Sequence, residues 1–134
     1  MMKRMHEEVE CTIPTIGFNV ETLTTRSNAF RCWDVGGCDK IRPLWRHYMI
    51  DVRLLVFMID STDVERLEDA LQELNYMLME NDMMGKPLLL LANKQDLPRA
   101  LSAGEIINKA KLHESTGRDW YVLPTTLMGT TNSV

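Results

Sequence analysis

The chain has 134 residues, of which 45% are hydrophobic and 25% are charged, and it contains 7 glycines and 5 prolines. These values lie near the average of globular proteins and exclude an intrinsically disordered, collagen-like or disulfide-dense chain. The formal net charge of -4 provides no basic surface for general binding of nucleic acids. We therefore expect one monomeric domain, spanning residues 1–134, with a packed core.

The longest uninterrupted apolar runs are too short to cross a bilayer. They cover residues 54–59 and 87–92 and suit buried strands instead. The N-terminus lacks the apolar stretch of a secretory signal, and Met2 stands where myristoylation requires glycine. The cysteines form no CxxC pair and, with the scattered histidines, give no zinc-binding spacing. We expect a cytoplasmic protein with reduced cysteines and no direct membrane anchor.

The first predicted elements are two strands that form a β-hairpin. Residues 17–24 and 29–35 both alternate between polar and apolar side chains, and the polar turn 26–28 separates them. Later in the chain, residues 53–59 and 88–92 are continuous apolar runs, which are typical of parallel strands covered on both faces.

Two helices are predicted between and after these runs. The first is indicated by apolar residues at helical steps of three and four, namely Val64, Leu67, Leu71, Leu74 and Leu78. Thr62 with Glu65 has the spacing of a capping box at its start, and Gly85 supplies a stop. Ser102 with Glu105 repeats the start signal for a second helix that runs to about residue 111. A last strand over 120–123 completes a doubly wound α/β pattern.

The most informative motif is Asn93-Lys94-Gln95-Asp96, directly after the apolar run 88–92. A doubly wound sheet binds its ligand at this carboxyl edge. An aspartate there can accept hydrogen bonds from N1–H and the exocyclic amino group of guanine, a donor pair that adenine lacks, while the lysine stem covers the ring. Taken alone, the motif also fits an ordinary solvated loop.

Two further motifs precede it. In Trp33-Asp34-Val35-Gly36-Gly37, the acid can hold a magnesium-bound water, and the glycines allow backbone N–H groups to approach a phosphate. In Thr12-Ile13-Pro14-Thr15-Ile16-Gly17, a threonine hydroxyl can ligate magnesium. A tight turn and a Thr-Pro loop are the simpler interpretations of each motif taken alone.

Together, the segments TIPTIGFNVETL, WDVGG with DKIRPLWRHY, the DST turn at Asp60, and ANKQDLP resemble the ADP-ribosylation factor family of small GTPases. The resemblance spans about residues 8–122 and implies a doubly wound P-loop NTPase fold. It also implies that GTP or GDP and Mg²⁺ are bound. Thr15 would ligate the metal, Asp34 would reach it through water, and Gly37 would donate to the γ-phosphate. Asn93, Lys94 and Asp96 would read guanine.

The resemblance further implies two switch loops, at about 9–19 and 36–48, whose geometry depends on the γ-phosphate. Effectors and exchange factors would contact an apolar surface formed by Ile16, Phe18, Trp33 and Tyr48. GTPase-activating proteins of the family would be further partners. The alternative is that Phe18 and Trp33 are simply core residues.

The sequence departs from the family in three places. No phosphate loop of the form GxxxxGK[ST] occurs in it, so the family's first strand, first helix and phosphate cradle have no counterpart. That strand would lie between the strands predicted at 29–35 and 53–59. Cys38 stands where the family has the glutamine that orients the attacking water, so intrinsic hydrolysis is expected to be very slow. Pro124-Thr125-Thr126-Leu127-Met128-Gly129 replaces the last guanine-contacting loop, and no last helix follows.

Two functions therefore stay open. The first is a guanine-nucleotide-dependent switch in vesicle-mediated traffic, cytoplasmic and peripheral to Golgi membranes through its partners, with impaired nucleotide binding and hydrolysis. The second is a non-enzymatic fragment that presents the switch-loop surface and holds no nucleotide. The chain would accordingly repack, be unstable alone, or be a truncated form of an ordinary GTPase.

Overall fold

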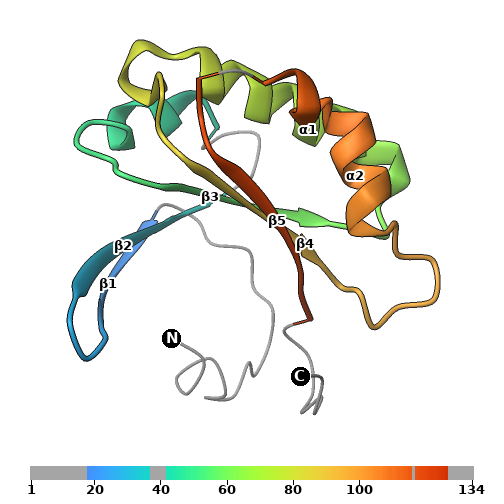
Figure 1. Ribbon diagram of the computed structural model, residues 1–134, viewed down its shortest axis with the longest axis horizontal. Helices are drawn as coiled ribbons and strands as arrows, with labels where there is room; N and C mark the ends of the chain where they lie inside the picture. Colours follow the sequence, from blue (N-terminus) through green and yellow to red (C-terminus); the bar gives the residue numbers. More distant parts are fainter. Residues whose placement is uncertain (1–17, 37–41, 116, 127–134) are drawn as a thin grey trace. The chain divides into compact units, whose positions relative to one another are not determined.

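A computed structural model describes residues 18–36, 42–115 and 117–126 of the chain (Figure 1). The chain divides into two compact units, which are described separately below: residues 1–50 with 130–134, and residues 51–129.

The first unit contains the predicted hairpin. Strands β1 (Phe18–Thr24) and β2 (Ala29–Val35) pair antiparallel, with Phe18 opposite Val35 and Thr24 opposite Ala29. The turn is closed by a 2.7 Å hydrogen bond from the N–H of Thr25 to the carbonyl of Asn28. The predicted pairing is therefore confirmed.

A 3₁₀ helix, η1 (Arg42–Tyr48), follows in the same unit. The indole Nε1 of Trp45 donates a 2.8 Å hydrogen bond to the carbonyl of Gly36, which fixes the helix to the end of the hairpin. No helix is predicted here from the sequence, because a short 3₁₀ segment lacks the apolar period of an α-helix.

The second unit is built on a parallel sheet of three strands in the order β3 (Leu55–Asp60), β4 (Leu88–Asn93), β5 (Trp120–Pro124). Both pairings are parallel, as predicted from the continuous apolar runs. Among the described residues, no strand pairs with the outer edge of β3, and β1 and β2 form a separate sheet.

Helices α1 (Val64–Met79) and α2 (Ala103–Ala110) lie over the same face of this sheet (Figure 1). Four members of the predicted stripe are buried, and the fifth, Val64, is 53% exposed at the start of α1. On the other face, Val56, Met58 and Tyr121 remain 45%, 47% and 63% exposed. Within this unit, the predicted covering of both faces is therefore observed for one face only.

The predicted capping box of α1 is wrong. The N-cap is Asp63, whose side chain accepts a 3.3 Å hydrogen bond from the N–H of Arg66. Thr62 cannot take this role, because its hydroxyl donates to Asp60 instead, at 2.6 Å. Thr62 and Glu65 have the spacing of a capping box, but the hydrogen bond from Thr62 to Asp60 of the preceding strand engages the hydroxyl.

The predicted start and end of the second helix are confirmed. Ser102 caps α2 by accepting from the N–H of Glu105, and α2 ends at Lys111 in the left-handed conformation, φ 53°. Gly85, the predicted stop, has φ 74°, a conformation that favours glycine, but α1 already ends at Met79 with Glu80 as its C-cap. Two short 3₁₀ helices complete the unit, η2 (Asn81–Met83) and η3 (Leu112–Glu114). None of the described helices is long and apolar enough to span a bilayer.

Candidate functional site

The candidate site lies at the carboxyl ends of the three parallel strands. Asp60, the last residue of β3, is in register with Asn93, the last residue of β4, and Ala92 is in register with Pro124 at the end of β5. The loops that follow β4 and β5 therefore leave the sheet side by side. This is the edge at which open α/β sheets bind ligands.

Backbone hydrogen bonds join these two loops. The N–H of Thr125 donates to the carbonyl of Ala92 at 2.9 Å, and the N–H of Gln95 donates to the carbonyl of Thr125 at 3.0 Å. The Thr125 hydroxyl donates to Oδ1 of Asn93 at 3.2 Å. The amide of Asn93 thus has a fixed orientation and ties the end of β4 to the loop after β5.

Asp96 is exposed and is held from the same loop. Its Oδ1 accepts a 2.9 Å hydrogen bond from the hydroxyl of Thr126. Within the described ranges, no hydrogen bond to its Oδ2 is observed. An oriented carboxylate with an open oxygen is the acceptor that the N1–H and amino group of guanine require.

Gln95 has a supporting role that the sequence did not indicate. Its Nε2 donates at 2.9 Å both to Oγ of Ser61 and to the carbonyl of Leu101. Ser61 is 1% exposed, and its carbonyl accepts from the N–H of Leu101. The side chain of Gln95 therefore points into the protein and anchors the loop between Lys94 and Asp96.

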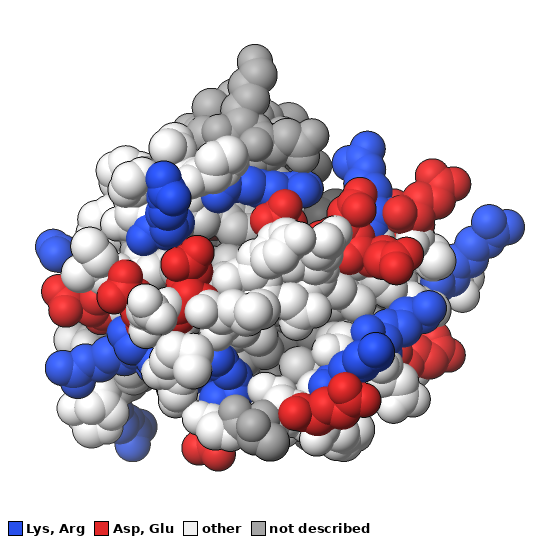
Figure 2. Space-filling model, turned by 90° about the horizontal axis from the view of Figure 1, so that it is seen from above, with Lys and Arg blue, Asp and Glu red and all other residues white. Residues whose placement is uncertain are grey.

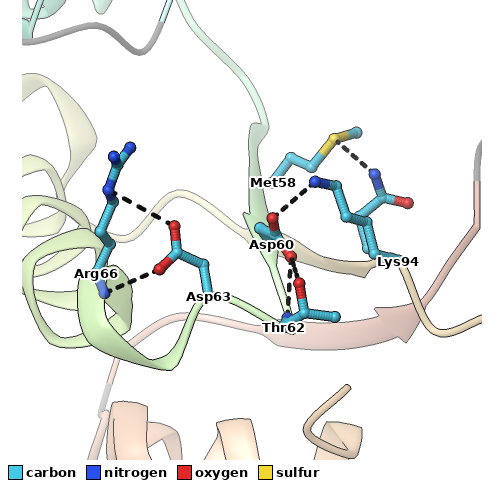
Figure 3. Close-up of polar contacts among 7 residues, drawn as sticks. Met58, Asp60, Thr62, Asp63, Arg66 and Lys94 are labelled. Atoms are coloured by element: carbon cyan, nitrogen blue, oxygen red, sulfur yellow. Dashed lines mark hydrogen bonds and ion pairs between the residues drawn. The ribbon is translucent and has the colours of Figure 1, made fainter. Parts of the chain in front are cut away.

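Lys94 makes an ion pair with Asp60 (Figure 3). Its Nζ lies 2.7 Å from Oδ2 of Asp60, while Oδ1 accepts from the N–H and hydroxyl of Thr62 at 2.9 and 2.6 Å. Burial alone would raise the pKa of Asp60, but the hydrogen bonds from Lys94 and Thr62 and the charge of Lys94 outweigh it and lower the pKa. The carboxylate is therefore ionised at neutral pH.

The structure describes one of the other predicted nucleotide ligands. Asp34 is an exposed residue near the end of β2, in the first unit. Thr15 and Gly37 lie outside the described residues, as does Cys38. The structure thus brings together the three residues predicted to read the base, and of the predicted phosphate and metal contacts it describes Asp34 alone.

The predicted partner surface is described in part. The rings of Phe18 and Trp33 lie on the hairpin with centroids 5.4 Å apart, and these residues are 49% and 45% exposed. Such exposure does not support the alternative that they are core residues. Tyr48 is the last residue of η1, and Ile16 lies outside the described part of the chain.

The side chains at the sheet edge can form hydrogen bonds with a guanine base, but the described residues do not include a cluster that would hold a metal ion. In the described part of the chain, no three His, Cys, Asp or Glu side chains gather to hold a metal ion. Of the two predicted magnesium ligands, only Asp34 is described.

Acidic and basic side chains are interspersed on the face seen in Figure 2.

The second unit presents an asparagine, a lysine and an aspartate after the middle strand of its parallel sheet, and this arrangement indicates the class of nucleotide-binding proteins. The model of the ADP-ribosylation factor family matches residues 1–133, and the chain belongs to this family. Its members are small GTPases, which bind GTP or GDP with Mg²⁺ and contact regulators and effectors.

A solved structure supports the same assignment. The chain is similar to the Arl6 (BBS3) small GTPase from Trypanosoma brucei, solved with the bound nucleotide analogue GppNp. The TM-score is 0.80 and the identity 29%, and the match covers 90% of this chain and 74% of that one. The small GTPase fold predicted from the motifs is therefore confirmed.

Sequence reasoning missed the threonines that orient the motif. The segment after β5 was read as a departure from the family, yet Thr125 and Thr126 hold Asn93 and Asp96. Hydroxyl residues directly after the last strand of a parallel sheet were the available signal, since all strand ends meet at one edge.

Proposed function

We propose that the chain is a guanine-nucleotide-dependent switch of the ADP-ribosylation factor type. The observation that carries this proposal is the carboxylate of Asp96, which Thr126 orients at the edge of the parallel sheet. Guanine presents two adjacent N–H donors there, whereas adenine presents an acceptor at N1. The site therefore favours guanine over adenine.

Each base-reading residue has a distinct role in this proposal. Asp96 accepts from the base, and the stem of Lys94 covers the face of the ring. Asn93 holds the two loops together through Thr125. The preorganisation of these side chains lowers the entropy that would be lost when the nucleotide binds.

We further propose that nucleotide binding is weak in this chain. The 134 residues contain no GxxxxGK[ST] string, so they lack the backbone cradle and the lysine that neutralise phosphate charge. Asp34, Gly37 and Thr15 are the residues assigned to the phosphate and metal side. Magnesium, when bound, offsets part of the phosphate charge.

Hydrolysis is expected to be slow for a second reason. Cys38 has neither the length nor the paired donor and acceptor that orient an attacking water. At saturating GTP, Cys38→Gln should therefore release phosphate faster than the unmodified chain. An equal rate would show that another group orients the water.

Equilibrium titration with a fluorescent guanine nucleotide and Mg²⁺ tests the proposed function. We expect saturable binding that guanosine diphosphate reverses, inosine diphosphate reverses less well because it lacks the amino group, and adenosine diphosphate does not reverse. No saturable binding, or equal competition by the adenine nucleotide, would overturn the proposal for this chain. Membership of the family would be unaffected.

A second candidate function is favoured by the two exposed rings of the hairpin. We propose that Phe18 and Trp33 contribute to a surface for effectors and regulators, which the chain presents even without nucleotide. Through such partners it would act in vesicle-mediated traffic, in the cytoplasm and at the periphery of Golgi membranes.

A further inference from the structure

We propose that Asp60 is a positioning residue for guanine-nucleotide binding, which acts by holding the side chain of Lys94 over the base site. This inference rests on the proposed function and adds to it a residue outside the Asn93–Asp96 motif. The geometry around both side chains supports it.

Asp60 is fixed on the protein side. It ends β3, and its Oδ1 accepts two hydrogen bonds from Thr62, one from the N–H at 2.9 Å and one from the hydroxyl at 2.6 Å (Figure 3). These bonds close the turn between β3 and α1 and set the rotation of the carboxylate. Oδ2 is left to face β4, where it accepts from Lys94 at 2.7 Å.

The backbone of Lys94 is also fixed. It has φ 64°, a left-handed conformation that non-glycine residues rarely adopt. The neighbours on both sides are anchored, Asn93 by Thr125 and Gln95 by Ser61 and Leu101. The left-handed turn at Lys94 is therefore maintained by its neighbours, and the side chain reaches back to the end of β3.

The consequence is a lysine side chain held at both ends. A free lysine has four rotatable side-chain bonds and loses much of its rotamer freedom when a ligand orders it. In this chain, the contact with Asp60 orders the stem before a nucleotide arrives. The ammonium group has three N–H donors, so hydrogen-bonding capacity remains for a ligand beyond the bond to Asp60.

A purely structural ion pair is the competing explanation. The side chains of Lys94 and Asp60 are 48% and 32% exposed, and pairs with this exposure contribute little to stability. A neutral residue in place of Asp60 should therefore leave the fold intact. Any large effect on nucleotide affinity would then come from the position of Lys94.

A double-mutant cycle tests the inference by titration with a fluorescent guanosine diphosphate. Asp60→Asn keeps an oxygen that can accept from Thr62 and removes the charge that attracts Lys94. Lys94→Met keeps the length of the stem and removes the ammonium group. We expect Asp60→Asn to weaken binding about 5-fold in the unmodified chain and to have no effect in the Lys94→Met chain.

Asp63→Asn is the matched control, because Asp63 lies in the same turn and pairs with Arg66 rather than Lys94. It should leave the affinity unchanged. Equal losses for Asp60→Asn in both backgrounds, or no loss in either, would overturn the inference while the proposed function stands. No binding by the unmodified chain would instead overturn the proposed function and this inference together.

A second measurement needs no nucleotide. Acylation of lysine amines, followed by peptide mapping, should label Lys94 faster in Asp60→Asn than in the unmodified chain. Exposed Lys109 on α2 should be labelled at the same rate in both. An unchanged rate at Lys94 would show that Asp60 does not hold it in solution.

Discussion

The hydroxyl of Thr126 donates a 2.9 Å hydrogen bond to Oδ1 of Asp96, across 30 residues of sequence. It orients a carboxylate that would otherwise rotate freely on an exposed loop. One oxygen is engaged by the protein, and among the described residues the other accepts no hydrogen bond. In the proposed function, this contact links the end of β5 to base recognition.

Thr126→Val should weaken guanine-nucleotide binding without unfolding the protein. Valine keeps the shape of threonine but removes the donor, which costs about 1 kcal/mol, or about 5-fold in the dissociation constant. Fluorescence titration measures the change. Thr22→Val on the exposed hairpin is the control and should bind as the unmodified chain does. An unaltered constant for Thr126→Val would mean that Asp96 is oriented by other groups.

Asp96→Asn should change the preference from guanine to xanthine. The asparagine amide is a donor and an acceptor, which matches the C2 carbonyl and N1–H of xanthine and leaves the guanine amino group facing another donor. We expect binding of guanosine diphosphate to fall about 100-fold, while xanthosine diphosphate gains. Competition against a fluorescent nucleotide measures both. Parallel losses for the two bases would contradict a direct contact with the base.

Arg118→Lys should destabilise the second unit by about 2 kcal/mol. The guanidinium donates to the carbonyls of Leu78 at 2.8 Å, Lys86 at 3.0 Å and Met83 at 3.2 Å, and so binds the end of α1 and its following loop. Lysine is a point charge that cannot reproduce this fork, so buried carbonyls lose their donors.

Urea unfolding followed by circular dichroism measures this loss. Arg66→Lys is the control, because that side chain is 84% exposed and, within the described part of the chain, forms an ion pair with Asp63 alone. It should change the free energy of unfolding by less than about 0.5 kcal/mol. Similar effects of the two substitutions would show that the three carbonyl contacts add nothing.

The ion pair of Asp60 should make stability depend on acid pH. Its pKa is lowered in the folded protein, so its contribution is fully present above the ordinary value of 3.8 and is lost as the pH falls through the lowered folded pKa. At these pH values the unfolded chain binds more protons at this group than the folded chain. Stability therefore rises with pH in this window.

Asp60→Asn should flatten this part of the pH profile and cost about 0.5 to 1 kcal/mol near neutrality. Urea midpoints between pH 2.5 and 6 measure it, with Asp69→Asn on the exposed side of α1 as the control. If the Asp60→Asn profile remained as steep as that of the control, the lowered pKa of Asp60 would not contribute to stability.

The double substitution Phe18→Ala with Trp33→Ala should abolish the capture of effectors and regulators of the family. As a consequence, the tagged chain should be lost from Golgi membranes. Phe30→Ala is the matched control. Phe30 is 54% exposed on the same hairpin, but its partner Leu23 lies on the opposite face from Phe18 and Trp33. Pull-down with nucleotide-free protein measures binding. Capture that survives the double substitution would remove the second candidate function.

The local elements were largely readable from the sequence, and the exceptions have specific causes. The stripe Leu67, Leu71, Leu74 and Leu78 gave α1, because helical spacing follows directly from 3.6 residues per turn. The start of α1 was misread since Thr62 bonds to Asp60 rather than capping the helix. Local spacing alone does not reveal when a hydrogen bond to the end of the preceding strand engages the hydroxyl that would cap the helix.

The sequence predicted the residues of the candidate site but not the residues that orient them. Asn93, Lys94 and Asp96 were recognisable because their types and their place after an apolar run both point to a base. Their orienting partners are Thr125, Asp60 and Thr126, which are 32, 34 and 30 residues away in sequence. Such pairs carry no local pattern.

The sequence by itself determined the family, the parallel strands and the residues that we propose to face guanine. Only the tertiary structure decided how these side chains are held. Asp60 meets Lys94, and Thr126 meets Asp96, because parallel strands in register bring all their carboxyl ends to one edge. The register of the sheet, which no single segment encodes, therefore turns separate strand ends into one site.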